Sequence, residues 1–214
     1  MPDSLLDKDL ERIPTSSRVI ALTFDAGANA DGVAPILATL AREGVAGTFF
    51  LTGDFVDQFP GPSRQIVAAG HRIGNHTVDH PHLPTLPDGQ VRAQVLDAQA
   101  KIRAVTGADP VPFFRFPYGD RNSHTIALVN QCGYGAIRWT VDSLGWQGTQ
   151  GGTRDASYVE RRVLNAATPG AIVLMHVGSN PDDHSTLDAA ALPGIVAGLR
   201  DRGYSFVTLD VLLT

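Results

Sequence analysis

Cysteine is nearly absent from this chain of 214 residues, because Cys132 is the only one. A single cysteine can form neither an intramolecular disulfide nor a cysteine-rich metal site. Cys132 follows an apolar helical pattern and precedes Gly133, so we expect it to pack as a small apolar side chain. With 43% hydrophobic residues, the chain is long enough to form one domain with a core of its own.

The chain also lacks long apolar runs and clusters of positive charge. No segment approaches the roughly 20 apolar residues of a membrane-spanning helix, so we expect no membrane span. Residues 1–14 are acidic and lack the apolar region of a signal peptide, which leaves two options open: a cytoplasmic protein, or a chain from which an export signal was removed. The net charge of −5 and the absence of a Lys/Arg run argue against nucleic acid or anionic lipid as a partner.

Short apolar runs rich in β-branched and aromatic residues alternate with amphipathic patterns along the chain. The runs predict buried strands at 18–24, 46–51, 71–74, 113–116, 136–141, 171–176 and 205–209. The amphipathic patterns predict helices at 33–43, 63–69, 88–105, 123–131, 157–167 and 187–199. About seven alternations predict an α/β fold with a parallel sheet, either an open doubly wound sheet or a barrel. The glycine-rich segment 145–152 has no phosphate-binding pattern and is expected to be a mobile loop.

Polar side chains stand at the ends of several of these predicted strands. In α/β folds, ligands bind at the carboxyl ends of the strands, so these side chains are expected to form a single site. Each also has an ordinary interpretation when taken alone, such as a helix cap, a structural salt bridge or a core histidine. The residues concerned are Asp25, His76, His80, Arg115, Asp142 and His176.

The segment His76-Thr77-Val78-Asp79-His80 is the most specific local signal. Two histidines four residues apart lie on one face of a helical turn, where both imidazoles can reach one metal ion. Such a pair is also found as ordinary surface or capping histidines. The preceding Gly74-Asn75 and the following Pro81 place it on a turn after a strand, which favours metal binding. Imidazole alone does not select among zinc, cobalt, nickel and iron.

Taken in order, five segments resemble the motifs of the polysaccharide deacetylases of carbohydrate esterase family 4, which share the NodB-type domain. They are TFDAG at 23–27, HTVDH at 76–80, RFPY at 115–118, DSLGW at 142–146 and LMH at 174–176. The resemblance begins near Arg18, so it implies an N-terminal extension over residues 1–17 and a catalytic domain over residues 18–214. The fold that it implies is a distorted (β/α) barrel with about seven parallel strands.

The resemblance also implies roles for individual residues. His76 and His80 would hold a divalent metal, with zinc expected and cobalt, nickel or another divalent cation as alternatives. Asp25 would be the general base, oriented and kept ionised by Arg115, while His176 would be the general acid, paired with Asp142. The backbone N–H of Tyr118 would hold the oxyanion. The residues expected to contact the substrate are Trp146, Leu174 and Pro117.

The implied activity is hydrolysis of acetyl groups on a polysaccharide or oligosaccharide. We expect N-deacetylation of N-acetylglucosamine units, as in peptidoglycan or chitin, by a monomer that acts outside the cytoplasm. Three alternatives remain: O-deacetylation of xylan, a catalytically silent carbohydrate-binding domain, and a metal-dependent amidase acting on small amides that are not sugars.

Two positions depart from the family pattern. The first motif usually carries a second Asp that binds the metal, and here Ala26 stands in its place. A replacement ligand, a weakly held metal with extra water, or an inactive site would each account for this change. We hypothesise that Asp31 completes the metal shell, although it could equally cap the helix that begins near Val33. In the fourth motif, Gly145 replaces an acidic residue that often precedes the Trp.

Overall fold

A computed structural model describes residues 2–213 and shows one sheet of nine strands, in which every pairing between strands is parallel. The sheet order is β1-β6-β5-β4-β3-β2-β8-β7, and β9 also pairs with β2. The strands are β1 (Asp9–Leu10), β2 (Val19–Ala26), β3 (Thr48–Leu51), β4 (Arg72–Asn75), β5 (Phe113–Phe114), β6 (Gly135–Ile137), β7 (Val141–Asp142), β8 (Ala171–His176) and β9 (Ser205–Phe206).

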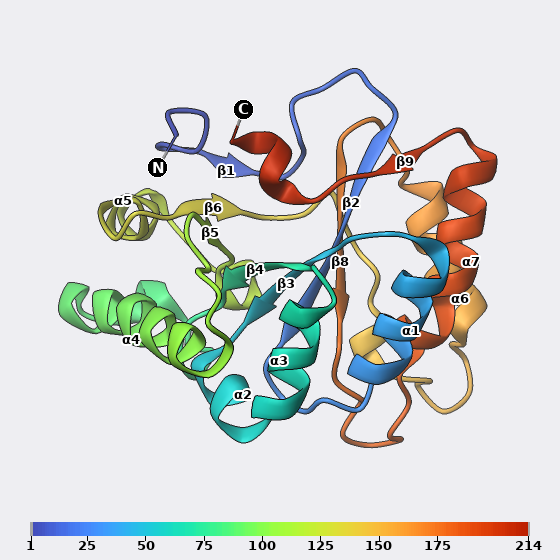
Figure 1. Ribbon diagram of the computed structural model, residues 1–214, viewed down its shortest axis with the longest axis horizontal. Helices are drawn as coiled ribbons and strands as arrows, with labels where there is room; N and C mark the ends of the chain where they lie inside the picture. Colours follow the sequence, from blue (N-terminus) through green and yellow to red (C-terminus); the bar gives the residue numbers. More distant parts are fainter. Residues whose placement is uncertain (1, 214) are drawn as a thin grey trace.

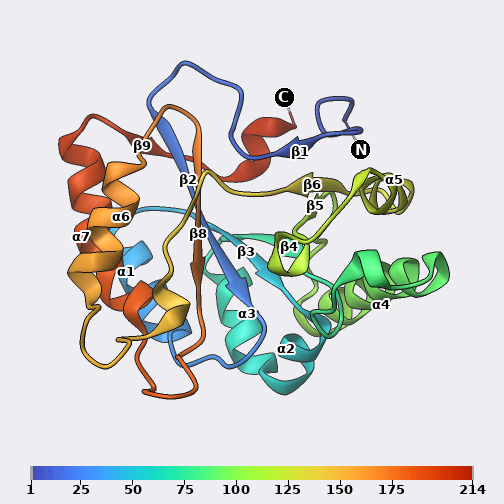
Figure 2. The same ribbon diagram turned by 180° about the vertical axis from the view of Figure 1, so that it is seen from behind.

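Seven α-helices in residues 2–213 cover the sheet. They are α1 (Val33–Glu43), α2 (Gly53–Gln58), α3 (Pro60–Ala68), α4 (Asp88–Thr106), α5 (Ser123–Gln131), α6 (Ala156–Asn165) and α7 (Leu187–Asp201). Helices α1, α6 and α7 pack together on one side, whereas α4 and α5 lie together at the other end of the sheet (Figures 1 and 2). None of the described helices is long and apolar enough to cross a membrane.

The segment predicted as one strand over residues 136–141 is two strands in the structure. β6 pairs with β1 and β5, whereas β7 pairs with β8, so the two lie near opposite ends of the sheet order. Residues 138–140 therefore span the gap between the two ends, where the Arg138 N–H bonds to Leu10 and the Thr140 N–H bonds to Ile172. This crossing partly closes the sheet, which confirms the predicted distorted (β/α) barrel.

Two elements were not predicted from the sequence. Helix α2 is short, and Thr52 caps it by accepting a hydrogen bond from the Phe55 N–H. Strand β1 lies before residue 18 and adds an edge strand beside β6, and Leu5 in the same segment is fully buried. The division of the chain at residues 17 and 18 stays a prediction.

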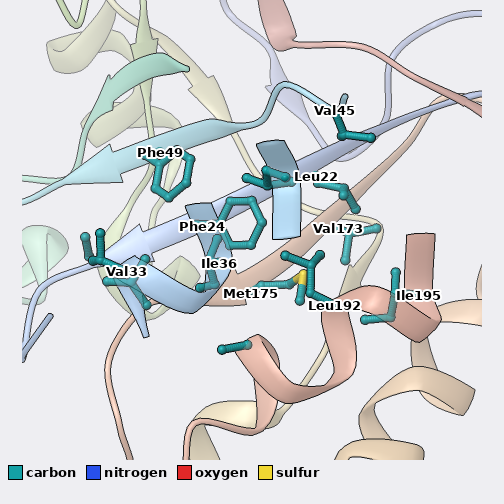
Figure 3. Packing of buried hydrophobic residues seen from close by; sticks show 14 of the residues in the cluster. Leu22, Phe24, Val33, Ile36, Val45, Phe49, Val173, Met175, Leu192 and Ile195 are labelled. Atoms are coloured by element: carbon teal, nitrogen blue, oxygen red, sulfur yellow. The ribbon is translucent and has the colours of Figure 1, made fainter. Parts of the chain in front are cut away.

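The largest apolar cluster fills the space between the sheet and helices α1 and α7. The rings of Phe24 and Phe49 stack there with centroids 4.7 Å apart (Figure 3). Leu192 and Ile195 from α7 face this cluster and are fully buried. Burial of each such side chain stabilises the fold by about 1.5–3 kcal/mol. Cys132 is half-buried and packs against a second cluster around α4 and α5.

Candidate active site

Strand register brings the predicted acid and base side by side. Asp25 near the end of β2 is the partner of His176 at the end of the parallel strand β8, and Asp142 on β7 is the partner of Leu174 on β8. The side chains open into a pocket of about 620 Å³ at this edge of the sheet. Its lining includes Asp25, His76, His80, Tyr118, Trp146 and His176.

Asp25 forms an ion pair with Arg115, as the sequence predicts. The Nη1 of Arg115 donates to Asp25 Oδ1 over 2.7 Å, and Asp25 is 7% exposed. Burial works to raise the pKa of the Asp25 carboxyl, but the charges of Arg115, His76 and His176 lower it below its ordinary value. Asp25 is therefore an ionised carboxylate at neutral pH.

Arg115 lies behind the pocket and is completely buried. Its Nε donates to the carbonyl of Ile137, and its Nη2 donates to the carbonyl of Arg138. The guanidinium carbon also lies 4.1 Å from the centre of the Phe50 ring. Because the guanidinium is fixed on three sides, it holds the Asp25 carboxylate in one orientation.

His76 and His80 meet, but not on a helical turn as predicted. They lie in an irregular loop after β4, in which Thr77 and His80 adopt left-handed backbone angles with φ of 71° and 62°. Asn75 Oδ1 accepts the Thr77 N–H and thereby stabilises the first of these bends. The two imidazole centroids lie 4.7 Å apart. The two histidines therefore meet because the loop bends between them, and the sequence pattern did not predict this bend.

The hydrogen bonding of His76 suits a metal ligand. Its Nδ1 lies 2.8 Å from the carbonyl of Arg115, which can only accept, so Nδ1 carries the proton. Burial lowers the pKa of His76, and the neutral ring therefore presents the lone pair of Nε2, which lies 3.4 Å from Asp25 Oδ2. Because both atoms are acceptors in a buried site, a cation bound by Nε2 would relieve the repulsion between them.

His80 is also neutral at physiological pH. Burial, followed by the proximity of His76, lowers its pKa to about 4. Its ring packs edge-on against Tyr118, with centroids 4.5 Å apart. A neutral imidazole is the form that binds a metal, so both rings are ready to act as ligands without losing a proton to water.

Asp31, the predicted third ligand, is not brought to the two histidines. It does not line the pocket, and its Oδ2 accepts a hydrogen bond of 2.6 Å from Ser179 Oγ. The side-chain amide of Asn29 also binds Ser179: its Nδ2 donates to the Ser179 carbonyl, and its Oδ1 accepts the Ser179 backbone N–H. Asn29 and Asp31 thus fasten the loop after β2 to the loop after β8. Asp31 does not cap α1 either, because the capping position is Gly32 and has no side-chain bond.

Within residues 2–213, no group of three or more His, Cys, Asp and Glu side chains is arranged to hold a metal ion. Ala26 is fully buried and belongs to the apolar cluster beneath the pocket. The side chains therefore fit a cation through two imidazoles, and they do not form a complete protein shell.

The predicted pairing of His176 with Asp142 is not formed. Asp142 accepts hydrogen bonds from the N–H of Leu144 and from Nε1 of Trp146 instead. The carboxylate next to His176 is Asp188, whose Oδ2 lies 3.7 Å from His176 Nδ1. Sequence reasoning missed Asp188 because an acidic residue in the first turn of a helix has an ordinary explanation in the helix dipole.

The predicted substrate contacts divide into two groups. Trp146 and Leu174 line the pocket, and Trp146 is 46% exposed. Pro117 is buried and does not line the pocket, so it can only shape the turn that carries Tyr118. The Tyr118 ring is 61% exposed and stacks on His82, with centroids 4.1 Å apart, at the edge of the pocket.

Comparison with known proteins gives consistent matches. The family model described as "Polysaccharide deacetylase" matches residues 12–137. The peptidoglycan-N-acetylglucosamine deacetylase PgdA of Listeria monocytogenes is 37% identical over 212 residues, which are 99% of this chain and 42% of that protein. The chain thus spans less than half of that relative. A chitooligosaccharide deacetylase of Azorhizobium caulinodans is 33% identical, and the match covers 92% of this chain and 96% of that protein.

Among solved structures, one similar protein is BA3943 of Bacillus anthracis, which is described as a carbohydrate esterase family 4 pseudoenzyme. It has a TM-score of 0.88 and 27% sequence identity, over 98% of this chain and 70% of that one. A mutant of BA3943 is described as having restored enzymatic activity. The matches in sequence and structure extend over the strands and the loops that carry the pocket, and this chain therefore belongs to the polysaccharide deacetylase family.

Proposed function

We propose that this protein hydrolyses acetyl groups on a polysaccharide, with N-acetylglucosamine units as the substrate. One observation carries the proposal: the register of the adjacent strands β2 and β8 brings the carboxylate of Asp25 and the imidazole of His176 into one pocket. The pKa of Asp25 is lowered, which suits a base, whereas the pKa of His176 is raised, which suits an acid. Burial alone would lower the pKa of His176, but Asp188, Asp25 and Asp142 outweigh it.

The chain's own groups account for the proton transfers of amide hydrolysis. Asp25 takes a proton from the attacking water, whose oxygen forms a bond to the acetyl carbonyl carbon. The backbone N–H of Tyr118 holds the oxyanion that develops. His176 then gives its proton to the leaving nitrogen, the C–N bond breaks, and the products are acetate and a free amine.

His76 and His80 would hold a divalent cation, which would polarise the carbonyl and activate water. Zinc is the proposed metal because neutral imidazoles are common zinc ligands, and cobalt and nickel remain alternatives. The hypothesis that Asp31 adds a third ligand requires its loop to leave Ser179. If Asp31→Ala kept the zinc affinity and the activity of the wild type, this hypothesis would fail.

The relatives support a cell-wall or chitin-type substrate, because their names are peptidoglycan and chitooligosaccharide deacetylases. The pocket is open at Tyr118 and Trp146, which are exposed aromatic rings of the kind that stack on sugars. We propose an acetylated glycan as the partner, a monomer as the active form and action outside the cytoplasm.

The test is to incubate the protein with acetylated chito-oligosaccharide, peptidoglycan, acetylated xylan and small non-sugar amides. Zinc or cobalt is added first and a chelator later, and acetate is measured. Chelator-sensitive release from the N-acetylated glycans is expected. Release from xylan alone would indicate an O-deacetylase, and release from the small amides alone would indicate an amidase.

Variants of the acid and the base test their roles directly. We predict that His176→Ala and Asp25→Asn each lower kcat by at least about a hundredfold, the usual scale of acid–base catalysis. The matched control is His124→Ala, because His124 is exposed and outside the pocket. If either variant kept activity within a few-fold of the wild type, its assigned role would be refuted.

Ala26 favours a second candidate function, a catalytically silent carbohydrate-binding domain. The silent domain would release no acetate with any metal and would still bind the glycan. If the missing carboxylate is the cause, Ala26→Asp would gain activity that the wild type lacks. The proposed enzyme requires activity in the wild type, so these two measurements separate the functions.

A further inference from the structure

Asp188 lies directly against His176, although the two residues belong to different elements. Asp188 is the second residue of α7 and is 3% exposed. Its Oδ2 accepts the backbone N–H of His176 over 2.8 Å and lies 3.7 Å from Nδ1 of the ring. Helix α7 thus places a buried carboxylate beside Nδ1 of the imidazole.

Among residues 2–213, Asp188 is the carboxylate that is placed to bind His176 Nδ1. Nδ1 of His176 and Oδ1 of Asp188 are both buried and have no hydrogen bond within the described chain. Asp142 is already bound to Leu144 and Trp146, and Asp25 is bound to Arg115. Closing the gap between Nδ1 and Oδ2 by about 1 Å would give an ordinary charge-assisted hydrogen bond.

We propose that Asp188 is the positioning residue of the general acid: it fixes the tautomer and the orientation of His176 and stabilises its protonated form. This inference rests on the proposed function, in which His176 protonates the leaving group. A hydrogen bond from Nδ1 to Asp188 keeps Nε2 directed at the pocket.

Gly145 explains how a carboxylate can reach His176 from α7. A Cβ atom at position 145 would lie 2.4 Å from Asp188 Oδ1 and 2.5 Å from Asp188 Cγ, which is closer than atoms can approach. Gly145 does not have a positive φ, so its backbone conformation does not require glycine. Glycine is required here because any side chain would collide with Asp188. A side chain at position 145 and the carboxylate of Asp188 would therefore occupy the same volume, so the structure can hold a carboxylate there from only one of the two positions.

The first test compares Asp188→Asn with the wild type. Asn keeps the shape and the bond to the His176 N–H, but it cannot neutralise a charged imidazole. We expect kcat to fall about ten- to hundredfold, with KM within about threefold. The matched control is Asp88→Asn, which removes an exposed acid from the first turn of α4. An unchanged kcat in Asp188→Asn would overturn the inference.

The pH profile separates a positioning role from a structural one. The charged groups that face His176 are Asp25 from β2, Asp142 from β7 and Asp188 from α7. The imidazoles of His76 and His80, which are neutral, are the other titratable groups near it. Without the charge of Asp188, the pKa of His176 falls. Because the general acid must be protonated, the loss of kcat at alkaline pH should then begin at a lower pH in Asp188→Asn than in the wild type. A loss that begins at the same pH as in the wild type contradicts the proposal.

A second-site variant tests the shared space. Asp188→Ala should lose activity as Asp188→Asn does, and Gly145→Asp added to Asp188→Ala should recover part of it by returning a carboxylate from the opposite side. Thermal unfolding confirms that each variant is folded. A folded double variant that is no more active than Asp188→Ala would overturn the claim that both positions serve His176.

The inference can also be decided without activity. NMR titration of the His176 imidazole should give a lower pKa in Asp188→Asn than in the wild type, while Asp88→Asn matches the wild type. If the wild type releases no acetate from any substrate with any metal, the proposed function fails and this titration still decides the role of Asp188. An unchanged pKa of His176 in Asp188→Asn would refute the proposed interaction between Asp188 and the His176 ring.

Discussion

At the scale of single residues, the buried ion pair of Arg115 and Asp25 is the most constrained feature of the site. Replacing Arg115 by Met would leave the Asp25 carboxylate buried without its cation. We expect the free energy of unfolding to fall by about 3–5 kcal/mol, measured by urea denaturation. The exposed pair of Arg103 and Asp109 offers a control, since Arg103→Met should leave the unfolding free energy nearly unchanged.

A double variant identifies the cause of that loss. Asp25→Asn combined with Arg115→Met removes the unpaired charge and should recover part of the stability lost in Arg115→Met. If the double variant were less stable than Arg115→Met by the full cost of Asp25→Asn, the two side chains would not be coupled in the way that their 2.7 Å contact indicates.

The residues of the site differ in how well the sequence predicts them. Asp25, Arg115 and His176 follow apolar strands, and parallel strands end at one edge, so their meeting follows from the pattern. Asp188 could not be found in this way, because its contact with His176 depends on the angle at which α7 returns to the sheet. Asp31 was expected at the metal, yet Ser179 binds it, and nothing in the sequence relates these two positions.

At the scale of elements, the loop after β4 and the turn that carries Tyr118 form one wall of the pocket. His82 stacks on Tyr118 with ring planes 11° apart, and its Nδ1 lies 2.8 Å from Asp120 Oδ2. His82 does not line the pocket itself, so it acts through Tyr118. The two segments therefore depend on an aromatic stack for their relative position.

Removing this stack should loosen substrate binding. We predict that His82→Ala raises KM about two- to tenfold, the equivalent of one aromatic contact, while kcat changes little. His82→Phe keeps a ring at the position and should restore KM, and His124→Ala serves as the control for loss of an exposed histidine. Steady-state kinetics measures both parameters, and an unchanged KM in His82→Ala would show that Tyr118 holds its position without His82.

Helices were easier to predict than strands in this chain. The ranges predicted for α1 and α5 are those observed, because glycine after α1 and the Asn122 cap before α5 fix the ends locally. β5, β7 and β9 have only two residues each, so their apolar patterns extend beyond the paired segment. Strand pairing depends on distant neighbours, which the local pattern does not contain.

At the scale of the whole molecule, an open sheet and a barrel could not be distinguished from the alternation of elements. The difference lies in residues 138–140, which carry the chain between the two ends of the sheet. Arg115 donates to the carbonyl of Arg138 in this crossing and to that of Ile137 directly before it, so the closure of the sheet and the orientation of Asp25 are linked. The pocket is therefore a product of the complete fold and not of one motif.

Metal binding should stabilise the whole domain if His76 and His80 hold the cation. Zinc at one hundred times its Kd would add about 2.7 kcal/mol to the free energy of unfolding and raise Tm by about 5–10 °C for a chain of this size. The double variant His76→Ala/His80→Ala should lose this shift, whereas His124→Ala should keep it, and a chelator should reverse it. Thermal unfolding at fixed protein concentration provides the measurement. A shift of equal size in the double variant would place the cation elsewhere in the protein, and the two neutral imidazoles facing Asp25 would then need another explanation.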